Sequence, residues 1–163
     1  MAFYYKIKFN IISYMKKICF VCHANICRSF GAQCILNNLA KKDNNTQVKA
    51  ISRGIYAQDF YAVPDKIWNF LASKGIEKTE HKSTLLTKED LENCDLILTM
   101  TADQKENILD RYAQFTDKVF MLQEYVYDKE EEVKDPISFS GSSFNKVMEK
   151  IYSAVCDLYA KIK

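Results

Sequence analysis

The fold of this chain is constrained most by an octapeptide near its start, CHANICRS at residues 22–29. A short apolar run at 18–21 precedes it and is typical of a buried strand. After it, apolar residues recur at helical spacing from Ala32 to Leu39. The octapeptide is therefore predicted to be a tight turn from a strand into a helix.

A turn of this kind directs backbone N–H groups toward one place, and the N-terminus of the following helix adds partial positive charge. Arg28 can close a bidentate fork on a phosphate-like oxyanion. Cys22, at the base of the loop, lies in the same field, which favours a nucleophilic thiolate. Ser29 can donate a hydrogen bond to the thiolate when it leaves. These residue types at this spacing indicate phosphoryl transfer to sulfur.

Strand-like and helical patterns alternate along the rest of the chain. Further strands are expected at 47–52, 95–100 and 118–122. Amphipathic helices are expected to begin near Pro64, Thr87, Thr101 and Phe144, with capping boxes at Thr87–Asp90 and Thr101–Gln104. This alternation predicts the α/β class: a four-stranded parallel sheet with helices on both faces, a flavodoxin-like three-layer sandwich. Ligands of such sheets bind beyond the carboxyl ends of the strands, which is where the octapeptide falls.

Composition narrows the class of protein. The 163 residues are 48% hydrophobic and 27% charged, which suits one soluble domain with a sizeable core. A net charge of +2 favours neither nucleic acid nor a membrane surface as a partner. No apolar run approaches the roughly 20 residues of a membrane-spanning helix, and the N-terminus lacks the pattern of an export signal. We expect a cytoplasmic protein that is a monomer or a weak dimer.

The chain divides into a short extension and one domain. Residues 1–14 precede the first strand, and two roles are open for them. Because Met15 resembles a second start, the extension is either an alternative upstream start or an added strand. Residues 15–163 are expected to form a single domain.

Phosphoryl transfer to sulfur also requires a group that protonates the leaving oxygen and later activates water. Asp135 can supply it, since it lies between a charged run at 129–134 and the last helix. Pro136 restricts this neighbour to extended conformations, which could aim the carboxyl group inward. The charged run itself is expected to be a solvated loop.

With these residues, the chain resembles the low-molecular-weight protein tyrosine phosphatases of bacterial type. That family's loop runs Cys-x-Gly-Asn-x-Cys-Arg-Ser, and its acid lies in a late Asp-Pro. Further landmarks follow in the family's order: Ser52 in Ser-Arg-Gly, His81 in Thr-Glu-His-Lys-Ser, and the strand at 95–100. The resemblance covers residues 16–160. It implies a phosphatase domain at 15–163 that uses no cofactor and no metal.

The resemblance implies that the protein hydrolyses phosphotyrosine in a protein substrate through a cysteinyl-phosphate intermediate. Inorganic phosphate is then the product and a competitive ligand. By the same resemblance Cys22 is the nucleophile, and Arg28 binds phosphate and the transition state. Asp135 is the general acid and later the base for water.

The resemblance also assigns the residues around the nucleophile. The phosphate-binding loop comprises His23, Ala24, Asn25, Ile26, Cys27 and Arg28. The residues implied to hold this loop in shape are Asn25, Ser29, Ser52 and His81. Cys27 corresponds to a vicinal cysteine that forms a reversible disulfide with Cys22, which would make the enzyme redox-regulated.

Departures from the family pattern bear on activity. Ala24 stands where glycine is usual, and its Cβ can crowd the loop. His23 occupies a position at the substrate mouth. The residues after Pro136 lack the aromatic pair that holds a phenyl ring in many members, although Tyr56 and Phe60 could substitute.

Other functions remain open. The related protein-arginine phosphatases usually carry threonine at the position of Ile26, whereas isoleucine is usual in the tyrosine-directed members. A thiol-dependent arsenate reductase needs two further cysteines close together, and Cys94 and Cys156 are far apart in the sequence. A non-catalytic phosphoprotein-binding module is the alternative of another class. Ala24 favours it, but binding alone would need neither the thiol nor the acid.

The remaining cysteines are expected to be structural. Cys19 and Cys22 form a Cys-x-x-Cys pair, but residues at this spacing on a strand point to opposite faces of the sheet. Without a second such pair, zinc binding is disfavoured. Cys34, Cys94 and Cys156 are predicted to be buried small hydrophobes.

Overall fold

The computed structural model describes residues 15–163; the extension at 1–14, with the two roles considered for it, lies outside the described residues. The strands are β1 (Lys16–Cys22), β2 (Val48–Gly54), β3 (Leu96–Thr99) and β4 (Val119–Met121). The helices are α1 (Arg28–Lys42), α2 (Asp65–Ser73), α3 (Lys88–Asn93), α4 (Ala102–Arg111), α5 (Leu122–Tyr127) and α6 (Gly141–Ile162), with a short 3₁₀ turn η1 (Ala113–Phe115).

The strands form a parallel sheet in the order β2-β1-β3-β4. β1 is internal, with Ile18 paired to Ala50 of β2 on one side and to Leu96 of β3 on the other. After β1 the chain forms β2 on one side of it and then crosses to form β3 and β4 on the other side. The carboxyl end of β1 is therefore a topological switch point, where such sheets bind ligands. The predicted four-stranded parallel sheet is confirmed.

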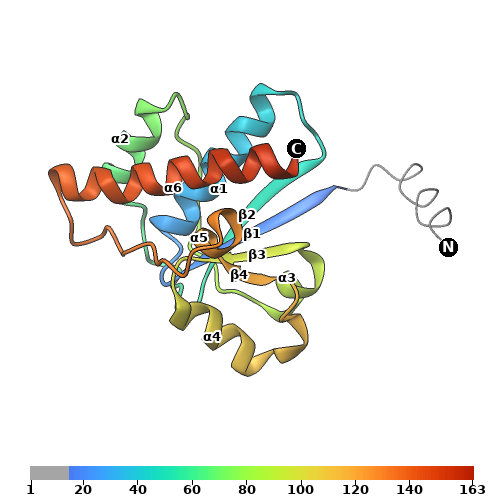
Figure 1. The fold of residues 1–163 in the computed structure, drawn as a ribbon. Helices are drawn as coiled ribbons and strands as arrows, with labels where there is room; N and C mark the ends of the chain where they lie inside the picture. Colours follow the sequence, from blue (N-terminus) through green and yellow to red (C-terminus); the bar gives the residue numbers. More distant parts are fainter. Residues whose placement is uncertain (1–14) are drawn as a thin grey trace.

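Helices cover both faces of the sheet, as predicted (Figure 1). α1 and α6 pack against each other over one face, and α3 and α4 lie on the other. Side chains of β1 alternate between the two cores. Phe20 and Cys22 join the larger core with residues of α1 and α6, whereas Cys19 and Val21 join the smaller core with Ile108 of α4. The two cysteines of Cys-x-x-Cys therefore face opposite sides, as predicted.

The long last helix holds its place through one apolar stripe. Met148, Ile151, Val155 and Leu158 of α6 are fully buried against the larger core. Fully burying a side chain of this size contributes about 1.5–3 kcal/mol. The stripe fixes α6 against α1, the helix that begins at the octapeptide.

Two capping boxes begin helices where the sequence predicted them. The Thr87 hydroxyl accepts from the Asp90 N–H at 3.2 Å, and the Thr101 hydroxyl accepts from the Gln104 N–H at 3.3 Å. In return, the side chains of Asp90 and Gln104 accept hydrogen bonds from the backbone N–H groups of Thr87 and Thr101. The second box sets the first turn of α4 just beyond the carboxyl end of β3.

Other predictions were wrong in detail. Val133, in the run expected to be solvated, is fully buried, and its N–H donates to the Met100 carbonyl at 2.8 Å. Cys94 is buried as predicted, but Cys34 and Cys156 are only half-buried. Helix α5 was not predicted, because a helix of one and a half turns shows no usable periodicity.

An ion pair ties β2 to α3. Arg53 donates from Nε and Nη2 to the two carboxylate oxygens of Asp90, each at 2.9 Å. Burial raises the pKa of Asp90, but hydrogen bonds from Arg53 and Thr87 outweigh it, so the pKa lies below its ordinary value. Because the folded pKa is the lower one, the charged carboxylate stabilises the fold above the unfolded pKa. That contribution is lost as pH falls through the folded pKa.

We predict that Asp90→Asn lowers the free energy of unfolding at neutral pH by about 1.5–3 kcal/mol, the range for hydrogen bonds to charged groups. The difference between wild type and variant should shrink as the pH falls below about 4, where the unfolded carboxyl group is protonated. Urea unfolding from pH 7 to pH 3 measures it. Glu89→Gln, an exposed neighbour in α3, is the control. A pH-independent difference would contradict the ion-pair account.

Candidate active site

The octapeptide forms the loop that joins β1 to α1. Cys22 is the last residue of β1 and is 2% exposed, and Arg28 is the first residue of α1 and is 4% exposed. The sheet and the helix thus hold the two ends of the loop. The predicted strand-to-helix turn is confirmed.

The polarity of the loop backbone suits an anion. Four carbonyls of the loop accept hydrogen bonds from segments outside it. These bonds run from Ile55 N–H to Cys22 O and Tyr56 N–H to His23 O, both at 2.9 Å, from the Ser83 hydroxyl to Ala24 O at 2.7 Å, and from His81 Nε2 to Asn25 O at 2.6 Å. In contrast, within residues 15–163 no backbone N–H from His23 to Cys27 donates to another group. Most carbonyls of the loop therefore have hydrogen-bond donors while its N–H groups remain available, which is what binding of an oxyanion requires.

Asn25 holds the loop from within. Its φ of +57° lies in the left-handed region, which asparagine tolerates better than most residues. Its side chain is completely buried and donates to Ser29 Oγ at 3.0 Å and to Ser52 Oγ at 2.8 Å. Its Oδ1 accepts from the Thr84 N–H at 3.0 Å. The amide is therefore bonded at both ends.

This network directs a proton toward the cysteine. Ser29 Oγ lies 3.0 Å from Cys22 Sγ. Since Ser29 Oγ already accepts from Asn25, its own proton is free for the sulfur. Ser52 is oriented in the same way, accepting from Asn25 and donating to Gln33 Oε1 at 2.6 Å. The hydroxyl can thus stabilise negative charge on Sγ.

His81 supports the loop as a neutral ring. Burial lowers its pKa, and the hydrogen bond to Asn25 opposes this only in part. Since the carbonyl of Asn25 can only accept, Nε2 carries the ring proton. The ring also stacks on Phe30 of α1, with centroids 3.9 Å apart. The loop is held from α1 and from the segment before α3.

Arg28 reaches across to the segment that follows α5. Nη1 donates to the Val133 carbonyl at 3.0 Å, and Nη2 lies 3.4 Å from Asp135 Oδ2. Its buried Nε has no hydrogen-bond partner in the described part of the chain. A buried N–H without a partner is costly unless a ligand satisfies it. The two Nη atoms of Arg28 thus contact residues 133 and 135, and the Nε–H group is left to bind an anion.

Asp135 lies at the junction of two cavities. It is 47% exposed, and its Oδ1 accepts from the Ile137 N–H at 3.1 Å. The smaller cavity, about 230 Å³, has as its lining Cys22, His23, Ala24, Ile26, Cys27, Arg28, Tyr61, Asp135 and Ile137. The larger, about 490 Å³, shares His23, Arg28 and Asp135 and extends to Tyr56 and the first turns of α4. The cysteine, the arginine and the acid predicted from sequence thus line one cavity.

Known proteins resemble this chain over most of its length. The sequence pattern of the low molecular weight phosphotyrosine protein phosphatases matches residues 17–163. The chain belongs to this family. Its members are hydrolases, so the protein is a low-molecular-weight phosphatase enzyme.

Individual relatives of this phosphatase fall into two groups by name. It is 30% identical over 146 residues to the protein-arginine-phosphatase of Bacillus subtilis, and the aligned region covers 90% of this chain and 96% of that protein. It is 34% identical over 147 residues to the low molecular weight protein-tyrosine-phosphatase PtpB of Staphylococcus epidermidis, with coverage of 90% and 96%. The crystal structure of a low molecular weight protein tyrosine phosphatase from T. tengcongensis matches with a TM-score of 0.84 at 28% identity, covering 90% of this chain and 99% of that one.

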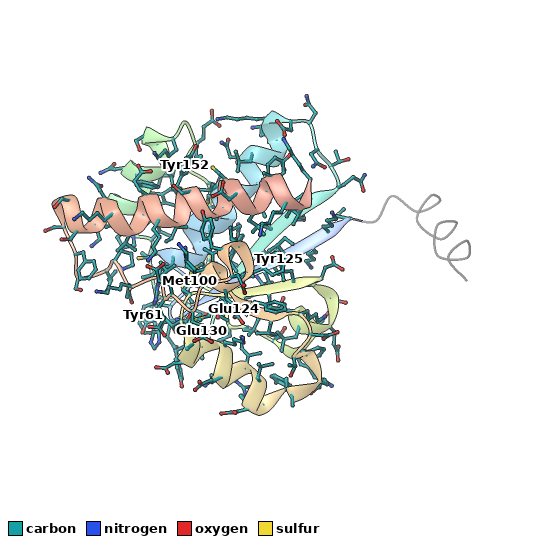
Figure 2. All side chains as sticks on the ribbon, in the orientation of Figure 1. Tyr61, Met100, Glu124, Tyr125, Glu130 and Tyr152 are labelled. Atoms are coloured by element: carbon teal, nitrogen blue, oxygen red, sulfur yellow. The ribbon has the colours of Figure 1, made fainter. Side chains whose placement is uncertain are left out.

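The aromatic side chains at the mouth of this phosphatase differ from the expectation. Tyr61, labelled in Figure 2, lines the smaller cavity. Tyr56 lines the larger one, where its ring lies 4.9 Å from that of His23. Phe60 is 79% exposed and lines neither cavity, but its ring meets that of Tyr61 at 4.9 Å. Tyr61 therefore takes the position expected for Phe60.

The structure also brings together two cysteines that looked unrelated in the sequence. Cys19 of β1 and Cys94, which precedes β3, lie together in the smaller core, where the neighbouring Cys94 thiol and burial raise the pKa of Cys19. Cys22 belongs to the larger core on the opposite face of the sheet. A close cysteine pair thus exists, contrary to expectation, but the sheet separates it from the loop.

Several supporting residues carried no signal in the sequence. Thr84 and Gln33 hold the loop from positions with no motif of their own, and Ser83, the last residue of the Thr-Glu-His-Lys-Ser landmark, had been given no role. Gly54 is different, because it closes the Ser-Arg-Gly landmark. A Cβ there would lie 2.7 Å from the His23 carbonyl oxygen and 3.1 Å from the Asn25 nitrogen. Glycine is therefore required where β2 passes the loop.

We predict that Gly54→Ala displaces the loop and lowers kcat/KM for p-nitrophenyl phosphate by about 10-fold or more, since small displacements of a reacting group are costly. Affinity for inorganic phosphate should fall with it. Gly31→Ala is the control, because its Cβ would meet only the flexible end of Met148 at 3.3 Å. Steady-state kinetics and phosphate titration measure both variants. Unchanged kinetics in Gly54→Ala would refute the close-approach argument.

Proposed function

We propose that the protein is a phosphotyrosine phosphatase that works through a cysteinyl-phosphate intermediate. The observation that carries this proposal is the loop of residues 22–28. Its N–H groups from His23 to Cys27 are without partners in the described chain, while Cys22 and Arg28 line the same cavity. A phosphate dianion would satisfy those donors and lie against the sulfur.

In the first step, Cys22 Sγ attacks phosphorus as the bond from phosphorus to the tyrosine oxygen breaks. Asp135 gives its proton to that oxygen, so the leaving group departs as a neutral phenol. Arg28 and the loop N–H groups hold the phosphoryl oxygens, on which charge is spread in the transition state. The position of Asp135, 3.4 Å from Arg28 and at the cavity junction, supports this role.

In the second step, water attacks phosphorus and Asp135 takes its proton. The bond from phosphorus to Sγ breaks, and Cys22 leaves as a thiolate. Ser29, 3.0 Å from Sγ with its proton free, stabilises that thiolate. Inorganic phosphate is released, and the enzyme returns to its starting protonation state.

The walls of the smaller cavity suit a flat aromatic group. Ile26, Tyr61 and Ile137 line it, and apolar and aromatic walls favour a phenyl ring over a charged one. The larger cavity adjoins it at Asp135 and could receive residues of the protein substrate beside the phosphotyrosine. This arrangement supports a protein rather than a small metabolite as substrate.

A protein-arginine phosphatase is the second candidate. The similarity to the Bacillus subtilis protein-arginine-phosphatase favours it. Its substrate would place a guanidinium rather than a phenyl ring between the same walls. Turnover of matched phosphotyrosine and phosphoarginine peptides separates the two candidates. Binding of either peptide without turnover would instead indicate a non-catalytic module.

We also propose that residues 15–163 act as one phosphatase domain in the cytoplasm. The described cysteines are all free, as is usual for a reducing compartment. Among residues 15–163, no helix combines the length and the apolar character needed to cross a bilayer.

We predict that Cys22→Ser abolishes turnover of p-nitrophenyl phosphate and leaves phosphate binding largely intact, because the loop donors remain. Arg28→Ala should lose both. Kinetics and phosphate titration of the two purified variants measure this. Hydrolysis by Cys22→Ser at the wild-type rate would mean that the nucleophile is another group.

We predict that Asp135→Ala lowers the rate on phosphotyrosine peptide by about 10²–10⁴-fold, the usual contribution of general acid–base catalysis. The loss should shrink as the leaving phenol becomes more acidic, because an acidic phenol needs less help from a proton. A leaving-group series of aryl phosphates with both proteins measures this. An equal loss on every substrate would rule out Asp135 as the acid.

We further propose that Cys27 protects the nucleophile from irreversible oxidation. Burial, followed by the nearby charges of Asp135 and Cys22, raises the pKa of Cys27 to about 12, so it stays a thiol at neutral pH. Peroxide would oxidise the Cys22 thiolate to a sulfenic acid. The Cys27 thiol then displaces the hydroxyl group, which leaves as water, and a disulfide forms. A thiol reductant restores both groups.

The predicted outcome is that peroxide-treated wild type regains activity with dithiothreitol, whereas Cys27→Ser regains less. Residual activity after peroxide and then reductant measures this. Cys34→Ser, a half-buried cysteine away from the loop, is the control. Equal recovery in wild type and Cys27→Ser would remove Cys27 from this role.

A further inference from the structure

Lys66, in the first turn of α2, makes an unusual set of contacts with the segment that carries the acid. We call residues 135–139 the acid segment. Nζ of Lys66 donates to the carbonyls of Pro136, Ile137 and Phe139 at 3.0, 2.6 and 2.9 Å. An ammonium group has three N–H donors, and all three of these therefore bind one short stretch of backbone.

These bonds lead directly to the acid. Ile137, whose carbonyl Lys66 holds, donates its N–H to Asp135 Oδ1 at 3.1 Å. The other oxygen, Oδ2, faces Arg28 Nη2 at 3.4 Å. We propose that Lys66 is a positioning residue for Asp135. It holds the backbone of the acid segment so that the Asp135 carboxyl group can reach the leaving oxygen of the substrate. This inference rests on the proposed role of Asp135 as the general acid.

Little else restrains the acid segment by hydrogen bonding. Its own bond, Phe139 N–H to the Pro136 carbonyl at 3.0 Å, shapes the turn but does not attach it to the body. In the described part of the chain, Lys66 is the side chain outside the segment that bonds to residues 136–139. Pro136 is buried and Phe139 packs against the larger core, but apolar burial is non-directional and does not orient the backbone carbonyls. A misplacement of about 1 Å can cost a catalytic group about 10²-fold.

A positioning role differs from a merely structural one in its kinetic signature. If Lys66 acts through Asp135, its loss matters only when the leaving group needs a proton. It also has no effect once Asp135 is absent. If Lys66 only braces α2 against the last helix, its loss affects every substrate alike and persists in the Asp135→Ala background.

The test compares Lys66→Met with wild type in a leaving-group series of aryl phosphates, each with Asp135 present and with Asp135→Ala. We expect a loss of about 10-fold on phenyl phosphate and less than about 2-fold on a strongly activated aryl phosphate. In the Asp135→Ala background we expect no further loss. Lys66→Arg should recover most of the activity, because it retains donors for the carbonyls.

Lys74→Met is the matched control. Lys74 follows the end of α2 and pairs with Glu149 at 2.7 Å, and its Nζ lies 4.4 Å from the ring of Tyr152, which Figure 2 labels on α6. It contacts α6 but makes no bond to the acid segment. Its substitution should leave the leaving-group dependence unchanged.

An equal loss on all substrates in Lys66→Met, or a further loss in the Asp135→Ala background, would overturn the inference. If Asp135→Ala itself loses the same factor on every substrate, the proposed acid is wrong, which is a separate outcome. If Lys66→Met does not fold, Lys66→Gln, which keeps an N–H donor but shortens its reach, is subject to the same two criteria.

Discussion

The buried amide of Asn25 is the interaction on which the rest of the site depends. Its backbone turns the loop through the left-handed region, and its side chain satisfies two serine hydroxyls and one backbone N–H. Ser29 can then donate its hydroxyl proton to Cys22 Sγ. The same amide therefore shapes the loop and orients a hydrogen bond toward the nucleophile. A side chain that could not both donate and accept would leave buried polar groups unsatisfied, which is costly at a low local dielectric.

The acid reaches the site by a different route. Val133 is buried in the larger core, and its carbonyl accepts a hydrogen bond from Arg28. Arg28 in turn meets Asp135, while Lys66 holds the backbone just beyond it. The arginine and the acid are thus placed by contacts between chain segments about 70 to 105 positions apart in sequence. Such contacts exist only once α2 and α6 have packed against α1, and α5 against β3 and β4.

Much of the fold could be predicted from local pattern. Both capping boxes, the alternation of strands and helices, and the opposite orientation of Cys19 and Cys22 follow from periodicity and short-range hydrogen bonding. Val133 was missed because a single apolar residue among charges has no periodic partner. Tyr61 could not be chosen over Phe60 as the wall of the cavity, because the two are neighbours and either could face inward.

The sequence by itself determined the residue types of the reaction, since Cys22, Arg28 and Ser29 lie within one turn whose geometry is local. It also determined the sheet class that places this turn at a strand end. The family resemblance of the sequence had also implied supports for the loop, but only the tertiary structure added Ser83 and Thr84 to them and showed that Lys66 holds the segment that carries the acid. The physical reason is that a hydrogen bond between distant segments depends on how the helices pack, and packing is not encoded in any short stretch of the chain.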